Sequence, residues 1–238
     1  MKPYQQIPIV ECGEPLVPIP LELFAVESPH PYEKLLAPYG DRSPYYLRQS
    51  VLANLITAQN YLQQQHPNWR IQIFDAYRPV QVQQFMVEYS FAQIVATQKL
   101  NLSEISESDR QQIWSQVYQF WAPPSLDPAT PPPHSTGAAI DITLVDERGN
   151  TINMGSAIDE ISPTSYPDYF ANSTNAIEQQ YHAHRQLLYN VMQTSGFQRH
   201  PNEWWHFSCG DQMWAWLSNQ TNPTNPVIAR YGRAGARD

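Results

Sequence analysis

Three short motifs in this chain bring together residue types that can bind a metal ion and hydrolyse an amide bond. In the first, His134 and Asp141 lie seven residues apart across a Ser-Thr-Gly turn. Zinc accepts imidazole nitrogen and carboxylate oxygen, and catalytic zinc sites use three protein ligands with one position open. Residues seven apart on a straight strand point to opposite faces, so we expect Gly137 to let His134 turn back toward Asp141. By itself this pair also fits a surface turn that leads into a core strand.

The second motif, Glu203–His206 (EWWH), supplies a third metal-ligand candidate and a candidate base. On a strand, His206 shares a face with Trp204 and Ser208, and the chain just before it can bend the Glu203 carboxylate toward the same site. A carboxylate beside a metal-bound water is the usual general base for peptide hydrolysis. The alternative is a tryptophan-rich core strand with His206 as a hydrogen-bonded core residue, and the motif alone favours neither interpretation.

The third motif, Asp75–Pro79 (DAYRP), places Arg78 between a predicted strand and a predicted helix. Loops at such positions often carry functional side chains. A guanidinium there can stabilise the oxyanion of a tetrahedral intermediate, a contact worth roughly 3 kcal/mol. A structural ion pair between Arg78 and Asp75 is the alternative, and the two roles are compatible.

Periodic apolar residues predict the helices and strands that must position these motifs. The predicted helices run from Leu47 to about Leu62, from Pro79 through Val87, from about Ser106 to Phe120, from about Asn175 to Thr194 and from Gln212 to Leu217, and the predicted strands cover Ile71–Phe74, Ala139–Val145, Phe197–Arg199 and Trp204–Ser208. Helices and strands mix without regular βαβ alternation. The predicted fold class is therefore α+β, with a central antiparallel sheet flanked by helices.

Irregular segments and one helix carry further expectations. Residues 1–45 hold many prolines and aromatics with little periodicity, so we expect an irregular segment with short strands, packed on the rest of the chain. The proline-rich residues 122–133 form either an interdomain linker or a rigid loop. Because the first motif begins directly after them, we favour the loop and a single domain over residues 1–238. The helix that Gly196 ends should turn four residues inward, namely Ile177, Tyr181, Leu188 and Val191.

Composition limits the partners and the location. With 14 basic and 22 acidic side chains, the formal net charge is −8. This argues against a nucleic-acid partner, because phosphate backbones are bound by basic surfaces. The N-terminus lacks the apolar run of a signal peptide, and no segment approaches the roughly 18 apolar residues of a membrane span. We therefore expect a soluble cytoplasmic protein with no membrane partner; the sequence indicates no oligomeric state.

The cysteines and the remaining histidines receive structural interpretations. Cys12 and Cys209 could pair, but two indifferent thiols are the expected state. No paired cysteines of the CxxC kind are present, which excludes a cysteine-built metal site. His182 and His184 are two residues apart on a predicted helix and so do not face each other. Three more histidines lie in proline-rich or loop segments and are expected to be solvated: His30, His66 and His200.

Taken together, Asp75–Pro79, the His134-x6-Asp141 pair and Glu203–His206 resemble the motifs of the D-alanyl-D-alanine dipeptidases, the VanX-type zinc peptidases. The order Arg, His, Asp, Glu, His along the chain is also that family's, and the resemblance extends from about Leu47 to Tyr231–Arg233. It implies a hedgehog/D,D-peptidase-like fold and one zinc ion. The implied ligands are His134, Asp141 and His206, with Glu203 as base and proton shuttle and Arg78 as transition-state clamp.

The segment Asn153–Asp159 resembles the family's MGxxFD stretch, whose Asp lines the substrate pocket. This implies that Asp159, together with Glu203, holds the ammonium of a D-Ala-D-Ala dipeptide. The chain departs from the family pattern at two positions: Ile158 stands in place of Phe, and Pro132 stands where a Ser is frequent. We expect the loss of that hydroxyl, which would touch substrate, to alter affinity or specificity.

Two other functions fit the same motifs. One is a D,D-carboxypeptidase or L-Ala-D-Glu endopeptidase that acts on cell-wall peptides; its action outside the cytoplasm agrees less well with the missing signal peptide. The other is a non-catalytic zinc-binding module, as in hedgehog-type domains. Such a module would lack the base or the clamp, whereas Glu203 and Arg78 are both present.

Overall fold

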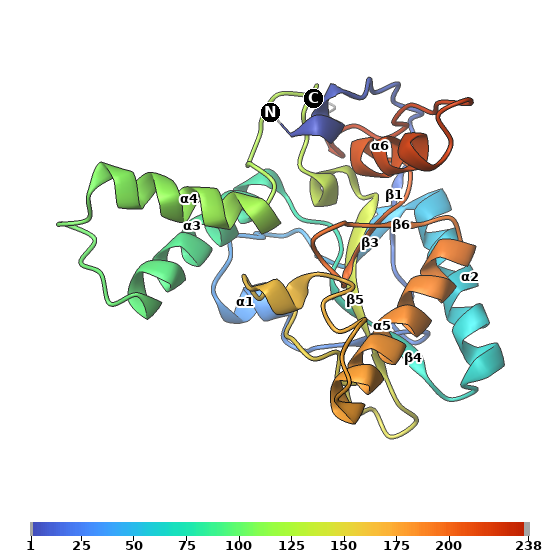
Figure 1. Cartoon of the computed structure of the whole chain (residues 1–238). Helices are drawn as coiled ribbons and strands as arrows, with labels where there is room; N and C mark the ends of the chain where they lie inside the picture. Colours follow the sequence, from blue (N-terminus) through green and yellow to red (C-terminus); the bar gives the residue numbers. More distant parts are fainter. Residues whose placement is uncertain (1, 236–238) are drawn as a thin grey trace.

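The fold is organised around strand β5 (Ala139–Val145), whose seven residues are all buried. The computed structural model describes residues 2–235 and places β5 at the centre of a five-stranded sheet in the order β2-β4-β5-β7-β6 (Figure 1). Strands β4 (Arg70–Asp75) and β7 (His206–Ser208) flank β5 and are antiparallel to it. At the edges, β6 (Gln198–Arg199) pairs antiparallel with β7, whereas β2 (Ala25–Val26) pairs parallel with β4.

The predicted α+β class and its helix-flanked sheet are confirmed, and the sheet is antiparallel except at the edge strand β2. The long helices are α2 (Gln49–Gln65), α3 (Val80–Thr97), α4 (Glu107–Phe120), α5 (Ala176–Thr194) and α6 (Gln212–Thr221). The short elements are η1 (Pro3–Gln6), β1 (Leu16–Pro18), α1 (Pro31–Lys34), β3 (Tyr46–Arg48), η2 (Pro133–Thr136) and η3 (Pro163–Ser165). All five predicted helices are present, and α3 and α6 run well beyond their expected ends.

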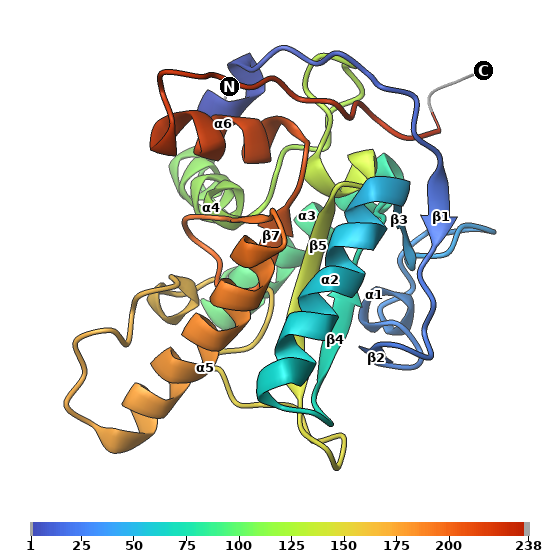
Figure 2. The same ribbon diagram turned by 90° about the vertical axis from the view of Figure 1, so that its right-hand side faces the viewer.

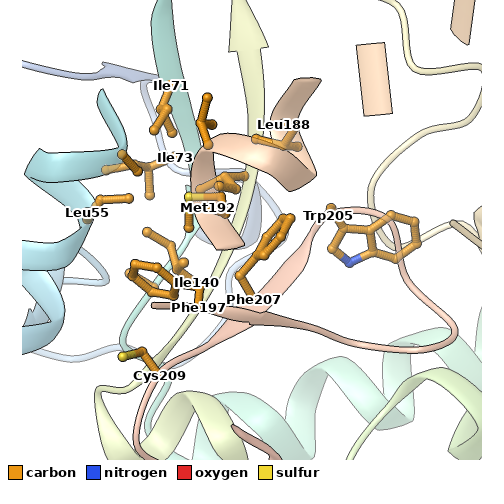
Figure 3. Close-up of a cluster of buried hydrophobic side chains, with 14 of the residues drawn as sticks. Leu55, Ile71, Ile73, Ile140, Leu188, Met192, Phe197, Trp205, Phe207 and Cys209 are labelled. Atoms are coloured by element: carbon orange, nitrogen blue, oxygen red, sulfur yellow. The ribbon is translucent and has the colours of Figure 1, made fainter. Parts of the chain in front are cut away.

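Helices α2 and α5 lie side by side over one face of the sheet (Figure 2). Between them and the strands is the main apolar core, in which Leu55, Ile73, Ile140, Met192 and Phe207 meet (Figure 3). Burying each such side chain contributes about 1.5–3 kcal/mol. This core fixes the strands that carry the first two motifs.

One detail of the predicted α5 packing was wrong. Leu188 and Val191 are buried as expected, but Ile177 is 63% exposed. Residues 174–177 are all exposed, so the start of α5 lies outside the core. Periodicity predicts the face of a helix but not how far the sheet beneath it extends.

A second apolar cluster joins α3 and α4, which form a helix pair that projects from the sheet (Figure 1). The proline-rich residues 122–133 run back from α4 to η2. The carbonyl of Ala122 accepts a hydrogen bond from Gln83 at 2.7 Å, and that of Ala129 accepts one from Gln212 at 2.9 Å. These bonds favour the rigid loop over a free linker.

The N-terminal residues contain short strands, as expected, together with η1 and α1. Cys12 is exposed and Cys209 is buried, and both are free thiols, in agreement with the expectation. Across residues 2–235, no helix combines the length and the apolar character that crossing a bilayer requires.

The loop that carries Asp159 depends on a glycine. Gly155 has φ +84°, and a Cβ there would lie 2.5 Å from ring atoms of both Phe170 and Tyr181. Gly149 has a similar φ of +82°, but no atom lies within 4 Å of its would-be Cβ. The two glycines therefore share the backbone requirement and differ only in the space around them.

We predict that Gly155→Ala lowers the free energy of unfolding by about 1–3 kcal/mol more than Gly149→Ala, because two rings must move in addition to the shared cost of positive φ. Denaturant unfolding of the two variants measures this difference. Equal losses of unfolding free energy in the two variants would contradict this prediction, because they would mean that the Phe170 and Tyr181 rings move aside without strain.

Candidate active site

Three neighbouring strands each contribute one polar residue to a row across the sheet. Asp75 on β4 lies opposite Asp141 on β5, and Asp141 lies opposite His206 on β7. The row depends on a bulge in β4, where the register shifts between Ile73 and Asp75. Without it, Asp75 would pair with Ile140 and point into the apolar core, because successive strand residues alternate faces.

His134 reaches this row from η2. The backbone turns at Gly137, which has φ +72°, directly before β5 begins. The imidazole Nδ1 is 2.7 Å from the carbonyl oxygen of Ala76, and the backbone N–H of Arg78 donates to the carbonyl of His134 at 3.3 Å. The turn predicted at Gly137 therefore exists, and the segment after β4 orients the His134 ring.

His134, Asp141 and His206 form a buried group whose donor atoms all lie within 4.8 Å of one another. His134 Nε2 is 3.2 Å from one carboxylate oxygen of Asp141, and His206 Nδ1 is 2.9 Å from the other. The two ring nitrogens are 3.1 Å apart. Burial raises the pKa of Asp141, but His134 and His206 outweigh it and hold that pKa well below its usual value.

Hydrogen bonds behind the rings indicate which nitrogens carry protons. A proton on His134 Nδ1 satisfies the Ala76 carbonyl. Ser208 Oγ donates to Asp211 at 3.0 Å and lies 3.3 Å from His206 Nε2, which places a proton on that nitrogen. His134 Nε2 and His206 Nδ1 then direct lone pairs at each other and at a carboxylate. Such a donor set fits a divalent cation, and outer hydrogen bonds that fix the histidine tautomers are typical of metal sites.

Glu203 lies beside this group and is 5% exposed. Its Oε2 is 3.9 Å from His206 Nδ1, and its Oε1 is 3.6 Å from His200 Nδ1. Among the residues that the structure describes, Oε1 has no hydrogen-bond partner. Burial, and next the charge of Asp141, raise the pKa of Glu203 well above its usual value. A buried carboxyl with an unpaired oxygen and a raised pKa can exchange a proton with a group in the adjoining cavity.

Arg78 is 3% exposed and bridges two carboxylates. Its Nε donates to Asp75 at 2.9 Å, and its Nη2 is 3.2 Å from Asp141. Burial opposes ionisation of Asp75, but the guanidinium and neighbouring histidines lower its pKa to about 2. The Arg78–Asp75 ion pair, which the sequence allowed as a structural alternative to a catalytic role, is therefore present. The same guanidinium also lines the cavity beside Asp141.

Asp159 is linked to Arg78 through Tyr32, whose Oη accepts a hydrogen bond from Arg78 Nη2 at 3.1 Å and donates to the Asp159 carboxylate at 2.7 Å. Burial, and next the charge of Asp141, raise its pKa to about 7. Asp159 lines the cavity, whereas its neighbour Ile158 packs on the main core and lines a separate surface groove. The departure at Ile158 therefore does not alter the cavity wall directly.

All six predicted site residues line one cavity of about 40 Å³, namely Arg78, His134, Asp141, Asp159, Glu203 and His206. A larger groove of about 650 Å³ between α3, α4 and the 159–166 loop shares the walls Phe120, Trp121 and Asp159 with it. The small cavity contains the polar groups, so it is the candidate reaction site.

Two histidines expected to be solvated are buried. His30 is 1% exposed, and its Nε2 lies 3.3 Å from Asp75. His200 is 7% exposed and lines the cavity, and burial followed by the charge of His206 lowers its pKa well below its usual value. The expectation for His200 was wrong because its burial depends on how the strands pair. His200 directly follows β6, and its N–H donates to the carbonyl of His206.

Several wall residues have no motif in the sequence. Lys2 and Tyr4 reach the cavity from the N-terminal segment, Trp121 from the position directly after α4, and Met213 from α6. Gln83 is the exception: it lies one turn into α3, five residues after Arg78, and accepts a hydrogen bond from that guanidinium at 2.9 Å. The other wall residues come from parts of the chain whose contacts depend on tertiary packing.

The Asp75–Arg78 pair generates a stability prediction. Asp75→Asn should lower the free energy of unfolding by about 3–5 kcal/mol at pH 7, because it leaves part of a buried guanidinium charge unpaired. Because the folded-state pKa of Asp75 lies below its usual value, the wild-type stabilisation is present above about pH 4 and is lost as pH falls toward about 2. Chemical unfolding with chelator at several pH values measures both effects.

A matched control is Asp168→Asn, which alters a pair with Arg199 at 3.8 Å in which Asp168 is 69% exposed. This change should cost no more than about 1 kcal/mol, as exposed pairs do. Equal losses in the two variants would contradict the structural role of the buried pair.

Comparison with known proteins identifies the family. The family model described as D-ala-D-ala dipeptidase, peptidase M15, matches residues 26–227. A D-alanyl-D-alanine dipeptidase of Synechocystis sp. (strain ATCC 27184 / PCC 6803 / Kazusa) is 50% identical over 239 residues, which cover 98% of this chain and 97% of that protein. The D-alanyl-D-alanine dipeptidase of Escherichia coli K12 is 40% identical over 74 residues, 31% of this chain and 36% of that protein.

Among solved structures, the LD-carboxypeptidase LdcB aligns with 90% of this chain and 75% of its own, at a TM-score of 0.41 and 14% identity. That similarity is too low to support a function. The family match over residues 26–227 and the 50% identity along nearly the whole length are sufficient on their own. The chain belongs to the D-ala-D-ala dipeptidase family of M15 metallopeptidases.

Proposed function

We propose that this protein hydrolyses the dipeptide D-Ala-D-Ala to two molecules of D-alanine, with a zinc ion held by His134, Asp141 and His206. The observation that carries the proposal is the buried His-Asp-His group with the unpaired carboxyl of Glu203 beside it in one small cavity. The substrate is the one named for the relatives that match this chain.

Zinc suits two imidazole nitrogens and one carboxylate, a ligand set that leaves a position open. Bound there, zinc would supply a Lewis acid that polarises the scissile carbonyl and makes an attacking water more acidic. The protein's own part is to hold the ligands in place. The Ala76 carbonyl and the Ser208–Asp211 pair orient the two imidazoles from behind.

Glu203 acts as the general base and then as the acid. Its Oε1 accepts a proton from the attacking water and delivers it to the nitrogen of the leaving D-alanine. The raised pKa of Glu203 suits the second step, because a carboxyl that holds the proton can pass it to the leaving nitrogen. Burial at 5% exposure keeps bulk water from exchanging that proton.

Arg78 and Asp159 each position one polar group of the N-terminal residue of the dipeptide. The Arg78 guanidinium, held by Asp75, stabilises negative charge on the carbonyl oxygen of the scissile bond. Asp159 pairs with the free ammonium of the dipeptide, and Glu203 adds to the negative potential that attracts it. Tyr32 Oη orients the Asp159 carboxylate for this contact.

The relatives favour the dipeptidase over the carboxypeptidase and endopeptidase alternatives. The family model that matches residues 26–227 and the relative that is 50% identical along nearly the whole chain are both described as D-alanyl-D-alanine dipeptidases. A non-catalytic module is disfavoured because the positions proposed for base and clamp hold Glu203 and Arg78, both buried at the cavity.

We predict that Glu203→Gln retains one zinc per chain but releases D-alanine from D-Ala-D-Ala at least about 100-fold more slowly, as expected for the loss of a general base. Metal analysis and an assay of free D-alanine measure the two properties. The control Glu104→Gln, at an exposed position, should match the wild type. Loss of zinc in Glu203→Gln would show that Glu203 is a ligand, and wild-type cleavage of longer wall peptides alone would favour the carboxypeptidase or endopeptidase.

A further inference from the structure

The N-terminal segment forms part of the active-site wall. Residues 2–6 lie against α6, at the same end of the molecule as the C-terminal part of the chain (Figures 1 and 2). Gln212 on α6 donates to the carbonyl of Ile7 at 2.7 Å and to that of Ala129 at 2.9 Å, which fixes the segment to the 122–133 loop. Farther along, Ile9 bridges to Ala229. Lys2 and Tyr4 are thereby held at the cavity.

The Lys2 ammonium has more N–H groups than its hydrogen bond to the protein uses. Its Nζ donates to the carbonyl of Trp121 at 3.1 Å. An ammonium carries three N–H groups, so two remain for another acceptor. Across residues 2–235, no carboxylate lies within 4.0 Å of Nζ. Lys2 and Glu203 both line the cavity. Burial lowers the pKa of Lys2, and the charge of Glu203 opposes that shift.

The other cation of the cavity is already occupied. Arg78 donates through Nε to Asp75, through Nη1 to Gln83 and through Nη2 to Tyr32, and it also contacts Asp141. These contacts use four of the five N–H groups of the guanidinium, and the proposed mechanism assigns the remaining one to the scissile carbonyl oxygen. A substrate carboxylate at Arg78 would have to displace one of these partners. Lys2 is therefore the better placed group to receive a negatively charged part of a substrate.

A dipeptide carries such a group. Its free ammonium is accounted for by Asp159, which Tyr32 Oη orients, whereas the Lys2 ammonium is held at the wall of the same cavity by the carbonyl of Trp121. Burying the dipeptide's carboxylate without a partner would cost several kcal/mol. A second cation in the cavity wall offsets that cost, and it favours substrates whose C-terminus is a free carboxylate.

We propose that the Lys2 ammonium binds the C-terminal carboxylate of the dipeptide and thereby makes the enzyme selective for substrates with a free C-terminus. This inference rests on the proposed dipeptidase function. It assigns a specificity role to an N-terminal segment that carries none of the sequence motifs.

The test compares D-Ala-D-Ala with its C-terminal amide, D-alanyl-D-alaninamide, which lacks only the negative charge. Wild type and Lys2→Met are assayed for free D-alanine with zinc bound and with any tag at the C-terminus, so that the segment around Lys2 is unaltered. Lys2→Arg tests whether charge restores function. Lys34→Met is the matched control, because Lys34 pairs with Glu27 on the surface and lies outside the cavity.

We expect Lys2→Met to raise KM for D-Ala-D-Ala about 10- to 100-fold, as for the loss of a charged hydrogen bond, and to leave KM for the amide within about twofold of the wild type. Lys2→Arg should recover most of the loss, and Lys34→Met should show none. Unfolding temperatures of the variants check that the fold is intact.

Equal effects of Lys2→Met on the acid and the amide, or no effect on either, would overturn the assignment while the dipeptidase function stands. A wild-type enzyme that releases D-alanine from neither compound would refute the proposed function, and the role of Lys2 would fall with it.

Discussion

The arrangement depends on how one guanidinium balances buried carboxylates. Arg78 lies between Asp75 and Asp141, with Asp159 just beyond Tyr32 and Glu203 across the cavity. The guanidinium keeps Asp75 ionised with a pKa of about 2, whereas burial and the charge of Asp141 raise the pKa of Asp159 to about 7. Burial likewise raises the pKa of Glu203. Partners close to each carboxylate thus separate the two kinds: Arg78 and the histidines keep Asp75 and Asp141 ionised, whereas burial and the charge of Asp141 favour the protonated forms of Asp159 and Glu203.

The sheet holds these charged side chains in position. Asp75, Asp141 and His206 lie on three adjacent strands, and the bulge in β4 brings Asp75 into their row. On the other side of the sheet, α2 and α5 cover an apolar core that includes Ile140 and Phe207, the neighbours of Asp141 and His206 in sequence (Figure 3). Core packing and site geometry therefore share the same strands, so the atoms proposed as ligands are held by strands whose apolar residues are fully buried.

Much of this could be predicted from the sequence, because the motifs combine distinctive residue types with local geometry. The turn at Gly137, the strand at 139–145 and the pairing of Arg78 with Asp75 all follow from short-range patterns. The six predicted site residues also lie together, as the resemblance to zinc dipeptidases implied.

What could not be predicted depends on contacts between distant parts of the chain. The β4 bulge leaves no sequence signal, because the strand alternates normally up to Asp75. Burial of His200 follows from its pairing beside β7, and that of His30 from packing near Asp75. Lys2 reaches the cavity only because α6 holds the N-terminal segment there. Local periodicity contains none of this information.

The most direct test of the account is the location of zinc in crystals of the zinc-loaded protein, measured by anomalous diffraction at the zinc absorption edge. The account predicts one peak per chain, about 2.0–2.2 Å from His134 Nε2, His206 Nδ1 and a carboxylate oxygen of Asp141. Glu203 should lie nearby without binding the ion. A peak coordinated by Glu203 or Asp159 in place of one of these three residues, or no peak in the cavity, would contradict it.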